Sequence, residues 1–280
     1  MPELPEVQTI INTLSSKGLI GKEIKSIDVF VPKIIKNTNP AGLNTFLKGE
    51  VFKKIERIGK YIVMHFSHDK ILLIHLRMEG KLFYIVNTEE SDKKHLRIKI
   101  NLSDGCSLLY YDSRMFGTFH IYKENDYRKS KEISKIAIDP LSKEFTYIFL
   151  KNKIHSKNTP IKSLLLDQSN VSGIGNIYAD EILYKAGVSP YEKGKNVTDE
   201  QIKLIVKYSK DILTKAISLG GTTIFSYKSD KNTSGHYQGK LQVHGREGEP
   251  CFKCKTKIVK VFINGRGTYY CPKCQKLSKK

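Results

Sequence analysis

The stretch from residue 251 to residue 274 reads CFKCKTKIVKVFINGRGTYYCPKC, with one Cys-x-x-Cys pair at each end and sixteen residues between the pairs. This spacing is typical of a tetrahedral zinc site with four thiolate ligands, here Cys251, Cys254, Cys271 and Cys274. Four thiolates leave the metal no open position, so we expect one structural Zn²⁺ per chain. Two disulfides are the alternative, but nothing in the chain indicates an oxidising compartment.

The residues between the two pairs predict what the zinc stabilises. Two β-rich runs, 257–263 and 267–270, flank Asn264-Gly265, which is a strong hairpin signal, and Arg266 follows the turn. From residue 240 to residue 280 the chain carries eleven Lys and Arg against two Glu, a formal charge of +9. Four thiolates around Zn²⁺ subtract only about two charges. This zinc module is therefore predicted to meet phosphate.

The charge of the whole chain agrees with that prediction. Its 280 residues carry a formal net charge of +20, with Tyr and Phe interspersed, which is typical of a nucleic-acid-binding protein. A membrane surface would also attract this charge, but no basic amphipathic helix with an aromatic face is evident. The longest apolar runs are too short to span a bilayer. No Lys or Arg precedes Lys17, so we expect neither a secretory nor a transit peptide. Together with the positive charge, this predicts a cytoplasmic protein that associates with the nucleoid.

The apolar pattern changes along the chain and predicts an α+β fold with two domains. Residues 4–19 carry apolar side chains at helical spacing, so a short amphipathic helix is expected there. Between residues 22 and 122 the chain is mostly strand-like, which favours an antiparallel β-sandwich. The clearest strand-like runs are 23–31, 61–66, 71–76, 81–86, 96–102 and 108–111.

After a charged stretch at 124–140, which has the composition of a linker, the apolar period becomes helical. Thr198-Asp199-Glu200-Gln201 is a capping box at the start of a helix that Gly220-Gly221 ends. We therefore expect an N-terminal sandwich at 1–123, a linker at 124–140, a helical domain at 141–240 and a zinc hairpin at 241–280.

Within the helical part, Gly173-Ile174-Gly175-Asn176 directly precedes a helical run. Two glycines permit a tight turn, and the N-terminus of the following helix attracts phosphate. Gly-x-Gly before a helix is common on its own, but beside a basic zinc module it favours a second phosphate contact.

The N-terminus is the second chemically informative feature. The initiator methionine is normally removed before a residue as small as Pro2, which would leave a secondary amine at the N-terminus. An α-amino group with a pKa of about 7.7–8.0 is roughly 10–17% neutral at pH 7, so it is a usable nucleophile without deep burial. Glu3 follows directly and could donate or accept protons. The simpler interpretation is that Pro2 only starts a helix.

Taken together, the two ends resemble a known family. MPELPEV at 1–7 and NGRGTYYCPKCQ at 264–275 closely resemble formamidopyrimidine-DNA glycosylase, the bacterial family that excises oxidised purines. The middle agrees, with RIGKY at 57–61, HLRM at 75–78, DSRMFG at 112–117, TPIK at 159–162 and GNIYAD at 175–180. The resemblance extends from residue 2 to about residue 276.

The resemblance implies four catalytic residues. Pro2 would form a Schiff base at C1′, and Glu3 would protonate the opening deoxyribose ring. Lys60 would assist β-elimination, and Arg266 would act in δ-elimination while it binds the phosphates beside the lesion. The implied activity is that of a bifunctional DNA glycosylase and AP lyase of base excision repair.

The resemblance also implies DNA contacts, at His75, His95, Arg114, Lys157, Lys162 and Asn176. Met78, Arg114 and Phe116 would fill the space left by the flipped nucleotide, with Arg114 facing the unpaired base. The chemistry fits, because apolar side chains can wedge a duplex open and a guanidinium can donate to cytosine. Met78 and Phe116 could instead be core residues, and His75 and His95 could be structural.

The implied fold is an N-terminal antiparallel β-sandwich followed by a helix-two-turns-helix domain with a four-Cys zinc β-hairpin. The implied partner is damaged double-stranded DNA, bound in the cleft between the domains by a monomer that needs no small-molecule cofactor. Two alternatives stay open. One is an endonuclease VIII-like glycosylase for oxidised pyrimidines, and the other is a non-enzymatic zinc-ribbon DNA-binding protein.

The sequence departs from the family pattern at Gln8, Met115 and Lys255, where Glu, Arg and Gly are usual. Lys255 directly follows Cys254, so a slightly different turn is expected in that zinc knuckle. Residues 221–239 correspond to the lesion-capping loop of the family, and their composition predicts mobility.

Overall fold

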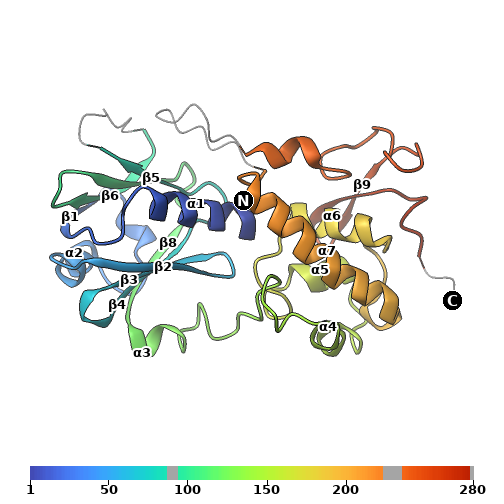
Figure 1. Ribbon diagram of the computed structural model, residues 1–280, viewed down its shortest axis with the longest axis horizontal. Helices are drawn as coiled ribbons and strands as arrows, with labels where there is room; N and C mark the ends of the chain where they lie inside the picture. Colours follow the sequence, from blue (N-terminus) through green and yellow to red (C-terminus); the bar gives the residue numbers. More distant parts are fainter. Residues whose placement is uncertain (87–93, 223–234, 278–280) are drawn as a thin grey trace. The chain divides into compact units, whose positions relative to one another are not determined.

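The computed structural model describes residues 1–86, 94–222 and 235–277, and the chain folds into two compact units (Figure 1). The described part of the first unit comprises residues 1–86 and 94–134, and that of the second comprises 135–222 and 235–277. Of the expected lesion-capping loop, residues 223–234 lie outside the described residues. Among the helices of the described ranges, none is both long and apolar enough to cross a membrane.

The first unit is an antiparallel β-sandwich. One sheet has the order β1-β6-β7-β5 and the other the order β2-β3-β4-β8, and all pairings are antiparallel. Inward-facing side chains of both sheets form one core, which confirms the predicted sandwich. The strands are β1 (Ile24–Val29), β2 (Phe52–Ile58), β3 (Tyr61–Phe66), β4 (Lys70–His75), β5 (Lys81–Ile85), β6 (Leu96–Leu102), β7 (Ser107–Tyr111) and β8 (Thr118–Lys123).

Three α-helices accompany the sandwich within the described residues of this unit. The predicted N-terminal helix is α1 (Leu4–Ser16), which packs against β2 and β3 of one sheet and β5 of the other. Within the region expected to be mostly strands, α2 (Pro40–Leu47) is a helix, because Asn39 caps it by accepting the Gly42 N–H at 2.8 Å. The expected linker begins with α3 (Glu124–Tyr127), and 3₁₀ turns lie at η1 (Pro32–Ile34) and η2 (Ser67–Asp69).

The second unit is helical and ends in a β-hairpin. Its elements are α4 (Tyr147–Ile154), α5 (Ile161–Leu166), α6 (Asn176–Ala186), η3 (Gly194–Asn196), α7 (Asp199–Ser218), η4 (His236–Lys240), β9 (Val259–Ile263) and β10 (Arg266–Tyr270). The predicted capping box starts α7, with the Gln201 N–H donating to Thr198 Oγ1 at 3.3 Å. As expected, α6 begins directly after Gly175.

The zinc hairpin has the predicted turn. Asn264 and Gly265 have φ angles of 47° and 72°, so both central residues are left-handed, as a two-residue type I′ turn requires. Arg266 pairs with Ile263 directly after the turn. A two-stranded hairpin therefore presents Arg266.

Candidate active site

The N-terminus of the first unit is fixed at the start of α1. Pro2 is buried and Glu3 is 2% exposed. The Glu3 N–H donates to Glu6 Oε2 at 2.9 Å, which holds the first helical turn. Pro2 therefore precedes the helix, next to a capped first turn.

Lys60 lies in the tight turn between β2 and β3, where Gly59 has a φ of 59°. Arg57 ties this turn to α1, because its guanidinium donates to Gln8 Oε1 at 3.0 Å and to the Gly59 carbonyl at 3.1 Å. Gln8, which stands where the family usually has Glu, therefore still accepts a hydrogen bond from Arg57, but through a neutral amide oxygen. Lys60 is only 7% exposed, so most of its side chain packs against the surrounding residues.

His75 ends β4 beside Lys60. Burial lowers the pKa of His75 to about 3, with further contributions from the charges of Arg77 and Lys60. Its Nδ1 accepts the Arg77 N–H at 3.0 Å, and the Tyr61 ring packs edge-on at 4.6 Å. The imidazole is therefore neutral at pH 7 with its proton on Nε2, which makes it an uncharged donor suited to a phosphate oxygen.

The three residues expected to fill a vacated duplex position lie in two loops of the first unit. Met78 follows β4 and is 39% exposed, and Phe116 lies between β7 and β8 and is 51% exposed. The Arg114 guanidinium stands 4.7 Å from the centre of the Phe116 ring. Neither apolar residue belongs to the core, so both are available as wedges.

His95 lies at the start of β6 and is exposed, with a left-handed φ of 69°. Its Nδ1 lies 3.1 Å from the Arg97 guanidinium, and its carbonyl accepts the Asp112 N–H at 3.0 Å. This backbone contact places His95 against the loop that carries Arg114.

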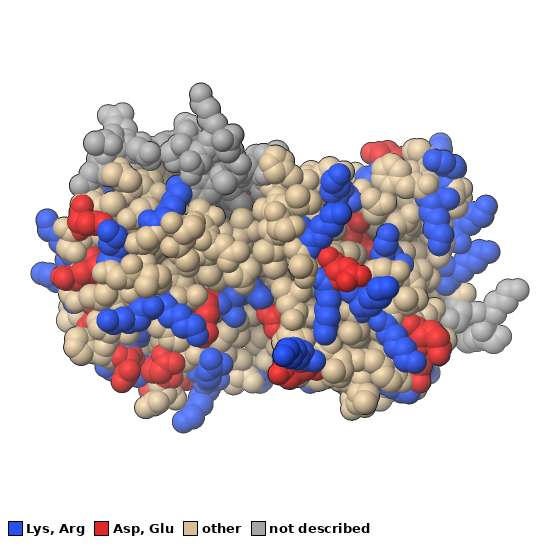
Figure 2. Space-filling view, in the orientation of Figure 1, with Lys and Arg blue, Asp and Glu red and all other residues tan. Residues whose placement is uncertain are grey.

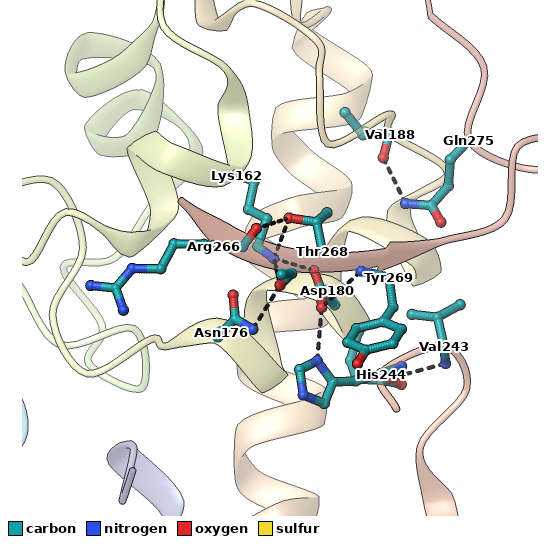
Figure 3. Close-up of polar contacts among 12 residues, drawn as sticks. Lys162, Asn176, Asp180, Val188, Val243, His244, Arg266, Thr268, Tyr269 and Gln275 are labelled. Atoms are coloured by element: carbon teal, nitrogen blue, oxygen red, sulfur yellow. Dashed lines mark hydrogen bonds and ion pairs between the residues drawn. The ribbon is translucent and has the colours of Figure 1, made fainter. Parts of the chain in front are cut away.

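In the second unit, Arg266 is exposed at the hairpin, and its side chain extends away from a buried polar network (Figure 3). That network centres on an ion pair between Lys162 Nζ and Asp180 Oδ1 at 2.7 Å, with both side chains fully buried. Lys162 also donates to Thr268 Oγ1 at 2.8 Å and to the Gly267 carbonyl at 3.0 Å. The expectation that Lys162 contacts DNA needs correction, because a side chain without exposed surface cannot touch DNA in this conformation.

Asp180 makes a further contact with β10 and connects the network to the segment around His244. Its Oδ2 lies 2.8 Å from His244 Nδ1 and accepts the Tyr269 N–H at 3.2 Å (Figure 3). The neighbouring Glu181 carboxylate accepts the backbone N–H groups of residues 242–244 at 2.8–2.9 Å. Two adjacent acids of α6 thus hold the hairpin and the segment that leads to it.

Asn176 opens α6 and is half-buried, and its Nδ2 donates to the Gly267 carbonyl at 2.9 Å. The glycine turn before it is held by Gln168, which accepts the Gly173 N–H at 2.8 Å and donates to the Ile174 carbonyl at 3.0 Å. The structure therefore brings Asn176 and the hairpin together within this unit. Lys157, after α4, is exposed.

The four cysteines of the predicted zinc site converge. Their Sγ atoms all lie within 4.8 Å of one another, and the Cys251–Cys274 and Cys254–Cys271 pairs lie at 3.9 and 3.4 Å. Zn–S bonds of about 2.3 Å in a tetrahedron give sulfur separations of about 3.8 Å. The cluster therefore fits a zinc ion.

Lys255 occupies the turn of the first knuckle with a φ of 64°, and its N–H donates to the Cys251 carbonyl at 2.9 Å. This is the left-handed conformation that glycine adopts without strain. Lys255 therefore adopts left-handed backbone at a steric cost, and the expected difference from the family's knuckle turn stays a prediction.

Basic side chains are prominent on the visible face of the second unit, where Lys and Arg gather over α4 and α7 (Figure 2). Exposed lysines of α7 include Lys203, Lys207 and Lys215. Such a face attracts a polyanion.

Three family models cover most of the chain. Residues 1–119 match "Formamidopyrimidine-DNA glycosylase N-terminal domain", residues 136–228 match "Formamidopyrimidine-DNA glycosylase H2TH domain", and residues 248–277 match "Zinc finger found in FPG and IleRS". The chain belongs to the formamidopyrimidine-DNA glycosylase family. This confirms the resemblance seen in the sequence and the helix-two-turns-helix and zinc-finger parts of the fold.

Relatives and solved structures agree along the whole chain. The formamidopyrimidine-DNA glycosylase of Mycoplasma pneumoniae is 44% identical over 275 residues, covering 98% of this chain and 99% of the relative. The Lactococcus lactis Fpg in complex with DNA containing Fapy-dG is similar with a TM-score of 0.90 at 34% identity, over 98% of this chain and 100% of that one. A complex of the same enzyme with DNA containing an oxidised pyrimidine gives a TM-score of 0.90 at 33% identity, with the same coverage.

Several residues that organise the site were not singled out from the sequence. They are polar side chains that form hydrogen bonds with other segments or with the backbone of their own loop: Asp112, Gln168, Asp180 and His244. For Asp180 the available signal was its place one helical turn after Asn176, on a run otherwise rich in apolar residues. The partner of Asp180, Lys162, was misread as a surface contact because a lysine is rarely fully buried.

Proposed function

We propose that the protein is a bifunctional DNA glycosylase and AP lyase that excises oxidised purines, such as 8-oxoguanine and formamidopyrimidines, from duplex DNA. The observation that carries this proposal is the pair of exposed apolar wedges, Met78 and Phe116, with Arg114 standing over the Phe116 ring. An enzyme that attacks C1′ must take the nucleotide out of the stack, and such side chains occupy the space it leaves. Family membership supports the same reaction.

The proposed chemistry starts at the N-terminal amine. After Met1 is removed, the Pro2 nitrogen attacks C1′ and the glycosidic bond breaks, with its electron pair leaving on the damaged base. Glu3 protonates the ring oxygen as the deoxyribose opens, which gives an iminium on Pro2. The iminium accepts electrons while β-elimination expels the 3′ phosphate, assisted by Lys60, and δ-elimination then expels the 5′ phosphate with Arg266.

The remaining polar residues bind and orient the DNA in this proposal. His75 offers its Nε2–H to a phosphate oxygen. Asn176 offers a side-chain N–H to another phosphate at the N-terminus of α6, where the helix dipole also attracts the negative charge. Lys157 and His95 are exposed and can contact the backbone. None of these contacts reads a base, so they position the duplex.

One structural zinc ion per chain is proposed for the four-cysteine cluster. Cys251, Cys254, Cys271 and Cys274 would hold it, and it would stabilise the hairpin that presents Arg266. The relatives are bacterial, which supports the expected action on the chromosome in the cytoplasm.

Borohydride trapping tests the proposal directly. Mature protein lacking Met1 is incubated with a duplex that carries one 8-oxoguanine opposite cytosine, and reduction should convert the iminium into a stable protein–DNA adduct. Protein verified by intact mass to retain Met1 is the matched control and should give none, because its Pro2 nitrogen is an amide. An adduct from the Met1-retaining form would overturn the role of Pro2.

A panel of duplexes with different lesions separates the proposed function from its two alternatives, an endonuclease VIII-like glycosylase and a non-enzymatic DNA-binding protein. A Lactococcus lactis structure holds DNA with an oxidised pyrimidine, so duplexes with an oxidised pyrimidine belong in the panel. Faster excision of the pyrimidine than of 8-oxoguanine would favour an endonuclease VIII-like specificity. Tight DNA binding without trapping on any lesion would favour a non-enzymatic DNA-binding protein.

A further inference from the structure

The Tyr110 hydroxyl lies at an unusual place in the first unit, between the two loops that carry Met78 and Phe116. Tyr110 is 1% exposed, and its ring packs edge-on against Phe119 at 4.8 Å in the sandwich core. Its hydroxyl donates to Asp112 Oδ2 at 3.1 Å. Burial and the neighbouring Asp112 raise the pKa of Tyr110, so the phenol stays a hydrogen-bond donor at neutral pH.

Both loops close directly onto this hydroxyl through a glycine. A Cβ atom at Gly117 would lie 1.7 Å from the Tyr110 hydroxyl oxygen. A Cβ atom at Gly80 would lie 2.7 Å from the same oxygen and 2.5 Å from the Leu76 carbonyl oxygen. Only glycine permits so close an approach, so the hydroxyl is packed against the end of the Met78 loop and the end of the Phe116 loop at once.

Asp112 extends this contact along the second loop. Its Oδ2 also accepts the Gly117 N–H at 2.8 Å, and its Oδ1 accepts the Arg114 N–H at 3.0 Å. Asp112 is 1% exposed, so water does not compete strongly for these bonds. One carboxylate therefore holds both ends of the segment that presents Arg114 and Phe116.

We propose that Tyr110 and Asp112 are positioning residues that join the two void-filling loops into one element, so that Met78, Arg114 and Phe116 enter the duplex together. The inference rests on the proposed function. The two residues touch no DNA themselves and act through the loops. Their contribution lies in the step that opens and reads the duplex, before the chemistry at C1′.

If Tyr110 and Asp112 join the two loops, removing the hydroxyl of Tyr110 should affect only the opening and reading of the duplex. Tyr110→Phe keeps the ring in the core and removes only the hydroxyl that both glycines contact. A misplacement of about 1 Å can slow a reaction roughly 100-fold, so we expect excision of 8-oxoguanine to slow by about 10- to 100-fold. The preference for cytosine over adenine opposite the lesion should shrink as well, because the carboxylate of Asp112, which accepts the Arg114 N–H, loses the hydroxyl that helps to orient it. Cleavage of a preformed abasic site, which needs less wedging, should change by less than about threefold.

The experiment measures single-turnover excision opposite cytosine and adenine, abasic-site cleavage and thermal unfolding for each variant. Tyr84→Phe is the matched control, since Tyr84 is 8% exposed in the same core and its strand partner is Leu108, away from both loops. Asp112→Asn is the second variant, because the amide has a single acceptor oxygen and cannot replace both carboxylate oxygens, which accept the Gly117 N–H and the Arg114 N–H.

The outcomes separate the inference from the function on which it rests. Tyr110→Phe and Asp112→Asn with full excision rate and full cytosine preference would overturn the coupling. An equal loss of excision and abasic-site cleavage, together with lowered stability, would also overturn it, since that describes a general folding defect. A native enzyme that excises no oxidised purine would instead overturn the proposed function.

Discussion

Replacing Lys162 by Met should destabilise the second unit strongly, because it leaves a buried carboxylate without its cation. Lys162 and Asp180 are both fully buried, with Nζ and Oδ1 2.7 Å apart. Without the ammonium, Asp180 retains His244 Nδ1 at 2.8 Å and the Tyr269 N–H at 3.2 Å. Removing one partner of a buried pair typically costs about 3–5 kcal/mol.

The expected change is large enough to measure in a thermal scan. In a protein of this size about 1 kcal/mol shifts Tm by roughly 2–4 °C, so we expect Lys162→Met to lower Tm by about 6–20 °C. Calorimetry of the zinc-loaded protein measures this shift, and fluorescence anisotropy on an abasic duplex follows the phosphate contacts proposed for Arg266. Affinity should fall too, because Lys162 binds the Gly267 carbonyl next to Arg266.

The chain offers a matched control and a sign test. Lys151→Met removes an ion pair in the same unit, with Asp199 at 2.8 Å, whose side chains are 33% and 41% exposed, and solvent screening should leave Tm nearly unchanged. Adding Asp180→Asn to Lys162→Met should recover part of the lost stability, because no unpaired charge then remains. The reasoning is refuted if Lys162→Met unfolds like Lys151→Met, or if the double variant is less stable than Lys162→Met alone.

Four further predictions concern other parts of the molecule. Cys271→Ser should release zinc and abolish tight DNA binding, whereas Cys106→Ser should keep both, as metal content and anisotropy would show. The pKa of His75 is lowered from about 6.5 to about 3, so the unfolded chain binds the extra proton between these values and stability should fall as pH drops through them. His75→Asn should flatten that part of a plot of unfolding free energy against pH. Lys255→Gly should raise the unfolding free energy by about 1 kcal/mol, because it relieves left-handed backbone at a φ of 64°. Arg114→Ala should reduce the cytosine preference in single-turnover excision, by about 5- to 150-fold if the guanidinium carries the reading, and an unchanged preference would contradict that role.

Local sequence patterns by themselves determined the cysteine cluster, the hairpin turn, two of the helices and the type of the N-terminal fold. The cysteine spacing predicted the thiolate cluster, and Asn264-Gly265 predicted the turn, since both residues tolerate the left-handed conformation found there. The capping box at Thr198 and the helical spacing after Leu4 predicted two helices, because these signals act within a few residues. Repeated short strand-like runs predicted the antiparallel sandwich.

Only the tertiary structure decided which polar side chains pair across distant segments. Lys162 and Asp180 are 18 positions apart, and Lys162 reaches residues more than 100 positions away, so no local pattern shows that its charge is buried. Likewise, the Tyr110 hydroxyl meets Gly80 from another loop, a proximity set by the pairing of β5 with β7. Sequence patterns report each segment's own propensity, whereas burial and long-range pairing arise only when the segments pack together.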